Sequence, residues 1–208
     1  MIKILKYDFK GMGYNSIVPI IAIIFISIYA RMITDSMYPV MIFLERFAPV
    51  FASWWIIQSI YLYVEKETCE IFLSYSYSRI EFGVVRVSIL LFAYTILIFL
   101  ATCHLNIFNI YVWLQLTVQS FFYASLGFFL VIYLQNGLWS TAIIFIVFAL
   151  NCLNEYFGSS IFGAQFYNIQ PVTLYDITSP GIRILIVSTI LLILAQYKLL
   201  KVQRRNGL

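Results

Sequence analysis

The sequence predicts an all-α protein that crosses a membrane several times, and three observations indicate this. Hydrophobic residues make up 62% of the 208 residues and charged residues 11%, with a mean hydropathy of +0.92. Soluble proteins hold about 45–50% apolar and about 25% charged residues, and a chain of this length cannot bury so much apolar surface in one core. The apolar residues also form runs long enough to span a bilayer, where only a helix satisfies its own backbone groups within one span.

Six apolar runs are predicted to be membrane-spanning helices within a single transmembrane domain, residues 1–208. They cover residues 17–33, 46–64, 83–102, 110–134, 138–153 and 182–200. The connection between the last two runs, 154–180, contains the stretch FGSSIFGAQFYNIQP. This stretch is too apolar for an ordinary loop and too short to cross, so we expect a re-entrant or interfacial segment.

Basic residues orient the predicted spans, because cytoplasmic loops carry an excess of Lys and Arg. One side would carry most of them: Lys3, Lys6, Lys10, Lys66, Arg79, Arg86, Lys198, Lys201, Arg204 and Arg205. The other side would hold Arg31, Arg46 and Arg183, and we expect Asp35 and Glu45 to offset the cost of the first two at that interface. Both termini and residues 65–81 are therefore predicted to be cytoplasmic, with 154–180 extracytoplasmic, in a multi-pass protein of a bacterial plasma membrane.

The first thirteen residues are predicted to form a separate amphipathic helix in the headgroup plane. Ile2, Leu5, Phe9 and Met12 share one stripe, and three lysines lie on a neighbouring one. The alternative is the charged start of a signal peptide, but no small-x-small cleavage site closes the apolar run that follows.

The inventory of reactive residues argues against an enzyme. A metal-dependent hydrolase needs several converging His or acidic ligands, and the chain has one histidine. A pair of His104 with a serine such as Ser125 is not excluded by counting, although an interfacial histidine is favoured. No Gly-Lys dipeptide occurs, so a phosphate-binding loop is absent and any ATP must be bound by another polypeptide. We expect no metal, cofactor or nucleic-acid site in this chain.

Polar residues inside the predicted spans permit two interpretations. Gln115, Gln119 and Tyr123 recur every four residues and so share one helix face. Such groups commonly form hydrogen bonds between helices, and the alternative is that they line a translocation path. Glu155 either lies at membrane depth, facing water or a partner, or at the interface, and both positions remain open.

The stretch EKETCEIFLSYSYSR, residues 65–79, is a charged island between two apolar runs. Its first part is predicted to be a short amphipathic helix, with Glu67 and Glu70 one turn apart. Ser78 and Glu81 match the S/T-x-x-E capping box before the next run. A charged helix across the cytoplasmic face can dock onto a cytoplasmic partner, or it can be a solvated connector.

The island resembles the loop between the second and third spans in permease subunits of type-2 ABC exporters. In that family a charged pair precedes Gly-Thr-x-Glu-x-Leu-Leu, a short turn, Pro and Ser-Arg. The matching positions here are Lys66, Thr68, Glu70, Phe72, Leu73, Ser74, Ser78 and Arg79. Glu67 and Ser76 stand where the family has Gly and Pro. The interfacial start also resembles the family's elbow helix, and re-entrant helices before the last span resemble 154–180.

This resemblance implies a function for each part of the chain. Residues 65–81 would contain the coupling helix, with Lys66, Glu67, Glu70, Leu73, Ser78 and Arg79 coupling to the ATPase. Separate ABC ATPase subunits would bind ATP and Mg, and a second permease subunit would complete the transporter. The cargo would be a hydrophobic or amphipathic peptide, bacteriocin or drug, with Gln115, Gln119, Tyr123 and Glu155 lining its path. The alternative is a membrane-embedded immunity or scaffold protein that acts by binding alone.

Overall fold

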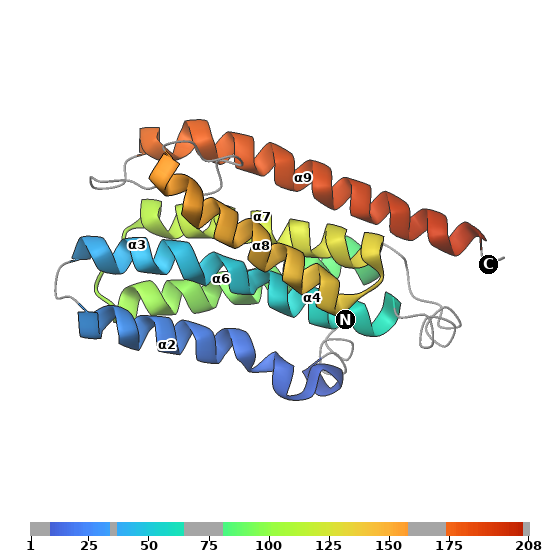
Figure 1. Cartoon of the computed structure of the whole chain (residues 1–208), viewed down its shortest axis with the longest axis horizontal. Coiled ribbons are helices and arrows are strands. Elements are labelled where there is room, and N and C mark those ends of the chain that lie inside the picture. Colours follow the sequence, from blue (N-terminus) through green and yellow to red (C-terminus); the bar gives the residue numbers. More distant parts are fainter. Residues whose placement is uncertain (1–8, 34–36, 65–80, 158–173, 206–208) are drawn as a thin grey trace.

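The computed structural model describes residues 9–33, 37–64, 81–157 and 174–205, and every regular element among them is helical. Short helical turns are η1 (Gly13–Ser16), η2 (Ala48–Phe51) and the π-helical η3 (Glu81–Val85). The α-helices are α2 (Val18–Ile33), α3 (Met37–Phe47), α4 (Ala52–Val64), α6 (Arg86–His104), α7 (Ile110–Leu134), α8 (Gly137–Phe157) and α9 (Leu174–Arg205). They lie side by side along one long axis, with α8 sloping across one face (Figure 1).

The protein is an all-α membrane protein, as the composition predicts. Among the described residues, five stretches are long and apolar enough to cross a bilayer: Phe9–Tyr29, Val40–Tyr61, Gly83–His104, Ile110–Leu134 and Pro180–Lys201. The apolar part of α8, Gly137–Cys152, is shorter. The part of the chain that the structure describes therefore contains five such stretches and this shorter apolar helix, where the sequence predicts six spans.

Helix α7 is the centre of the bundle. Of its apolar window 72% is buried, against 22% for α9 and 28% for the stretch that includes α2. It contacts α4, α6, α8, α9 and η2. Gly127 permits the close approach of α4, because a Cβ built there would lie 3.0 Å from the Ser53 Cβ.

Local sequence explains where α7 and α8 begin. The Asn109 side chain accepts a hydrogen bond from the Tyr111 N–H at 3.0 Å, which caps the start of α7. Asn136 does the same for α8, with its Oδ1 accepting from the Trp139 N–H at 3.1 Å. Between α7 and α8, Gln135 takes a left-handed conformation, with φ 52°, and this ends α7.

A proline lies in the short turn η2, which separates the consecutive helices α3 and α4. Pro49 has no N–H, and the chain there tightens into the 3-10 turn η2, in which Ala52 N–H donates to the Pro49 carbonyl. The Ala48 carbonyl accepts a hydrogen bond from the Tyr94 hydroxyl of α6. A hydrogen bond from α6 thus stabilises the turn between α3 and α4.

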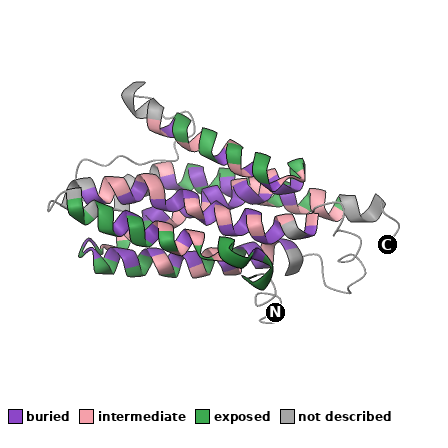
Figure 2. Cartoon of the chain, turned by 60° about the horizontal axis from the view of Figure 1, so that its bottom comes forward, coloured by how far each residue is buried: buried purple, intermediate pink, exposed green. Residues whose placement is uncertain are grey.

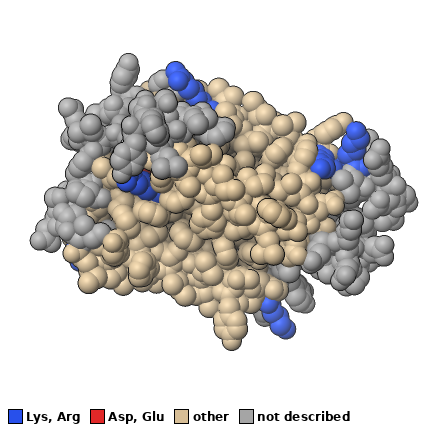
Figure 3. Space-filling model, viewed as in Figure 1, with Lys and Arg blue, Asp and Glu red and all other residues tan. Residues whose placement is uncertain are grey.

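The outer surface is apolar, as expected of a protein solvated by lipid. Exposed residues follow the outward faces of the helices in Figure 2. On α2 and α9 these include large apolar side chains: Ile21, Ile24, Phe25, Ile28, Ile182, Ile186, Ile190 and Ile193. In Figure 3 a broad band of the described surface is neither acidic nor basic, and the Lys and Arg atoms lie around it.

Several sequence predictions fall partly or wholly outside the described residues. Of the predicted N-terminal helix, residues 9–12 are described as helical and the chain then turns at Gly13, where φ is +54°. The island and the centre of the predicted re-entrant segment, 158–173, lie outside them. The flanks of that segment are helical, since 154–157 belong to α8 and 174–180 to α9.

Candidate functional site

A stripe of polar side chains runs along the bundle side of α7. Gln115, Gln119 and Tyr123 are 2%, 1% and 1% exposed. The four-residue spacing places all three on one face, so the structure brings together the three α7 residues that the sequence singles out. Because each is deeply buried, each needs polar partners inside the bundle.

Glu45 on α3 is the first of these partners. Its carboxylate Oε1 accepts a hydrogen bond from Gln119 Nε2 at 2.9 Å, and Glu45 is only 2% exposed. The side chain of Glu45, which the sequence analysis expects to offset Arg46 at the outer interface, therefore lies inside the bundle against α7. The helix begins at Met37, well before the predicted start of the span, so Glu45 falls on its buried face beside Leu44 and Ala48.

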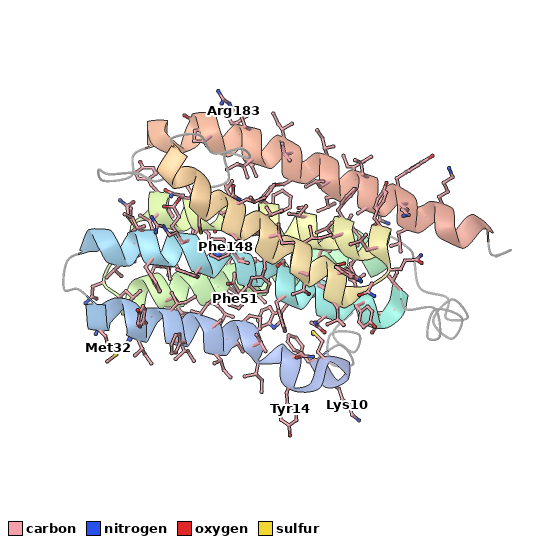
Figure 4. All side chains as sticks on the ribbon, viewed as in Figure 1. Lys10, Tyr14, Met32, Phe51, Phe148 and Arg183 are labelled. Carbon is pink, nitrogen blue, oxygen red and sulfur yellow. The ribbon has the colours of Figure 1, made fainter. Side chains whose placement is uncertain are left out.

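The second partner comes from α8. Asn151, 1% exposed, donates from Nδ2 to the Tyr123 hydroxyl over a long 3.4 Å. The rings of Phe47 and Phe148 lie 5.4 Å apart between α3 and α8. Figure 4 labels Phe148 near the middle of the bundle's length. We call Glu45, Gln115, Gln119, Tyr123 and Asn151 the polar cluster.

The polar cluster holds more acceptors than its hydrogen bonds use. Gln115 Oε1 and Gln119 Oε1 are buried and have no hydrogen-bond partner within the part of the chain that the structure describes. Since the Nε2 and Oε1 of Gln119 belong to one amide, this acceptor lies next to the Glu45 carboxylate. Buried polar groups of this kind favour water or a polar ligand over hydrocarbon.

A second group of polar contacts lies where α4 ends and η3 begins, on either side of the island. The Arg86 guanidinium carbon is 4.2 Å from the centroid of the Tyr63 ring, and Arg86 is 3% exposed. Gln196 Oε1 of α9 accepts a hydrogen bond from the Val84 N–H at 3.2 Å. We call these four residues the junction.

Most of the other predicted site residues lie outside the described residues, whereas His104 and Ser125 lie within them. Those assigned to ATPase coupling lie in a range that is not described: Lys66, Glu67, Glu70, Leu73, Ser78 and Arg79. Glu155 belongs to α8, but its side chain is also outside the described residues. His104 ends α6, and its carbonyl accepts from Arg31 Nη2 at 2.6 Å. Ser125 is buried, whereas His104 is exposed.

Sequence reasoning missed Glu45 and Arg86 as buried residues and Gln196 as a half-buried residue that contacts η3. A lone acid in an apolar helix is a signal for Glu45, because an intramembrane carboxylate needs a partner.

Within the described ranges, no group of three or more His, Cys, Asp or Glu residues is placed to hold a metal ion. No family model, no curated protein and no solved structure matches the chain.

Proposed function

We propose that this chain is the membrane-spanning subunit of an ABC exporter, driven by a separate ATPase. The observation that carries the proposal is the charged island 65–79, which lies between two apolar helices and resembles the coupling loop of type-2 permeases. Lys66, Glu67, Glu70, Leu73, Ser78 and Arg79 are the residues that would contact the ATPase or hold the loop's fold.

The junction supports this proposal because it joins the helices on either side of the island. In the chain the island follows Val64, the last residue of α4, and precedes Glu81, the first residue of η3. The contact of Arg86 with the Tyr63 ring joins the two helices that carry it. A loop mounted on two joined helices can transmit a movement of its docking partner to the bundle, which a loosely attached connector cannot.

The polar cluster supports the transport part of the proposal. A path for an amphipathic cargo needs acceptors and aromatic faces within an apolar bundle, and Gln115, Gln119 and Tyr123 supply them. Glu45 adds a carboxylate next to Gln119. Glu155 is the fourth residue that we assign to the path, from its sequence position. The cargo class is a hydrophobic or amphipathic peptide, bacteriocin or drug.

The assembly and orientation follow from the same proposal. Transporters of this class use about twelve spans, so a second permease subunit, identical or related, would pair with this chain, and two ATPase subunits would bind ATP and Mg. Both termini and the island would face the cytoplasm, because the basic residues concentrate on that side. Residues 1–13 would be the elbow helix and 154–180 the extracytoplasmic re-entrant segment of a six-span subunit.

The competing function is a membrane-embedded immunity or scaffold protein that binds a partner without transport. Purification of the tagged chain from its native membranes separates the two. The exporter predicts a co-purifying ATPase with a phosphate-binding loop and ATP hydrolysis that cargo stimulates. A complex without an ATPase would favour the binding protein.

A further inference from the structure

The side-chain amide of Gln115 is buried and forms no hydrogen bond within the part of the chain that the structure describes. Gln115 is 2% exposed, on the bundle side of α7. It lies about 7 Å along the helix axis from Ile110, since an α-helix rises about 1.5 Å per residue. An amide removed from water without a partner destabilises a folded protein, so nearly all such groups in native structures bond to protein or to ordered water.

Gln119, one turn further along α7, has a similar deficit on one side of its amide. Its Nε2 donates to Glu45 Oε1 at 2.9 Å, whereas its Oε1 is buried without a hydrogen-bond partner among the described residues. Residues four apart on a helix have their Cβ atoms about 5–6 Å from each other. The two amides are therefore neighbours, although neither donates to the other.

Other polar side chains of α7 do not supply the partners. Ser120 Oγ donates to the Leu116 carbonyl at 2.7 Å, within the helix itself. The Tyr123 hydroxyl accepts from Asn151 Nδ2 at 3.4 Å, and no hydrogen bond in the described ranges uses its own O–H. The groups left unpaired on this face thus include donors, Gln115 Nε2 and the Tyr123 O–H, as well as the two Oε1 acceptors.

A water molecule matches this mixture of groups better than a cation does. A metal ion or an ammonium group would use the two Oε1 atoms and the Glu45 carboxylate, but the donors of Gln115 and Tyr123 would stay unpaired. Water both donates and accepts, and one water about 3 Å from each amide can bridge side chains on successive turns. Buried waters typically make about three hydrogen bonds to groups that are otherwise unsatisfied.

We propose that Gln115 and Gln119 bind an internal water molecule, which bridges their two amides beside the Glu45 carboxylate. The two residues lie about 7–14 Å along α7 from its first residue, so the site is within the bundle rather than at its end. It belongs to the face that the proposed function assigns to the cargo path. The inference concerns the chain without cargo and does not rest on that function.

Water-edited solid-state NMR of the purified, isotopically labelled full chain in lipid bilayers tests the site directly. Magnetisation from water protons should reach the side-chain amides of Gln115 and Gln119 several times faster than the backbone amide of Phe128, because the transfer falls steeply with distance. Phe128 is 0% exposed on the same helix and serves as the dry reference. Transfer to both glutamines as slow as to Phe128 would overturn the proposal.

Removal of one amide should release the water from the other. In Gln115→Leu, transfer to the Gln119 side chain should fall to the rate at Phe128, because one amide alone cannot form the bridge. Gln58→Leu makes the same change at a half-buried glutamine on α4 and is the matched control, in which transfer to Gln119 should stay fast. Fast transfer to Gln119 in Gln115→Leu would overturn the bridge.

A double-mutant cycle in denaturant titrations gives an independent readout. Gln115→Leu should raise the equilibrium constant for unfolding about two- to tenfold, because it removes hydrogen bonds to the water. Combined with Gln119→Leu, it should cost less than the sum of the two single losses, since both variants release the same water. Additive losses would contradict the bridge, as would a Gln115→Leu variant more stable than wild type, the result expected for an amide buried dry. If Gln115→Leu does not fold, the wild-type transfer rates decide by themselves.

Discussion

Gln119 on α7 and Glu45 on α3 form a hydrogen bond at 2.9 Å between two side chains that are almost completely buried. They are 74 positions apart in the sequence, so the bond fixes two helices relative to each other. An amide that donates to a carboxylate inside an apolar bundle is a strong contact, because neither group has water as an alternative.

Removal of the Gln119 amide should therefore destabilise the bundle. Gln119→Leu leaves the Glu45 carboxylate without this donor, and we expect a loss of about 1.5–3 kcal/mol in the free energy of unfolding. The control is Gln58→Leu, at a half-buried glutamine on α4 that makes no hydrogen bond within the described residues. Denaturant titration of both variants in detergent measures the difference, and equal stability would show that the pair contributes nothing.

The close approach of α4 and α7 should depend on the absence of a side chain at Gly127. A Cβ there would lie 3.0 Å from Ser53 Cβ and 3.3 Å from Ile57 Cγ1, so Gly127→Leu should force the helices apart. Overpacking of this kind costs about 1–3 kcal/mol. Ala142→Leu, at an exposed position on α8, places a leucine on the surface with one carbon less of added bulk and should be neutral. Thermal unfolding of the two variants compares them directly, and similar midpoints would contradict the packing argument.

The junction should depend on an aromatic ring beside Arg86. Tyr63→Leu removes the ring face that the guanidinium contacts, whereas Tyr63→Phe keeps it. A desolvated cation–π contact contributes about 2 kcal/mol or more, and an exposed one about 0.5–1 kcal/mol. We expect Tyr63→Leu to lose stability in this range and Tyr63→Phe to stay near wild type. A Phe variant as unstable as the Leu variant would shift the role from the ring to the hydroxyl.

The proposed orientation makes a labelling prediction on native and introduced thiols. Cys103 is free and exposed near the end of α6 that would face outward. With Cys69 and Cys152 changed to Ser, an impermeant maleimide should label it in intact cells. Tyr14 is 93% exposed, and Figure 4 shows it pointing away from the bundle near Lys10. A cysteine substituted for Tyr14, with Cys103 also removed, should react only after permeabilisation. The reverse pattern would invert the orientation.

The class of fold could be predicted from composition and run length, because apolar side chains in lipid need no specific partner. The helix bounds follow the runs closely in α7, where the predicted and observed limits coincide at 110 and 134. They fail at α3, where the sequence places a loop before residue 46. The adjacent charges of Glu45 and Arg46 interrupt the apolar residues there, so the sequence does not identify a span. The structure shows that these residues belong to helix α3 and that Glu45 is buried against Gln119.

The polar cluster could be predicted only in part. A four-residue spacing identifies Gln115, Gln119 and Tyr123, because helix geometry alone puts them on one face. Their partners Glu45 and Asn151 come from helices far away in the sequence, and spacing holds no information on which helices meet. The same limit applies to Gln196, whose contact with Val84 joins the two ends of a 112-residue separation.

The central claim, that the island couples this subunit to an ATPase, is tested most directly by two single substitutions within it. Glu70→Ala and Arg79→Ala should leave membrane insertion and abundance near wild type, because neither residue lies in an apolar run. Each should reduce co-purification of the ATPase and the cargo-stimulated part of its hydrolysis in reconstituted membranes. A partly desolvated charged hydrogen bond contributes about 1.5–3 kcal/mol, so docking should weaken roughly tenfold or more.

Lys201→Ala, an exposed charge near the end of α9, is the matched control and should leave docking unchanged. Exposed charges in a simple connector contribute only about 0–1 kcal/mol. The decisive measurement is thus the amount of ATPase retained, with its stimulated hydrolysis, by the Glu70 and Arg79 variants at normal expression. Loss in both variants and retention in the control is the predicted result, and wild-type values in both would contradict the coupling role.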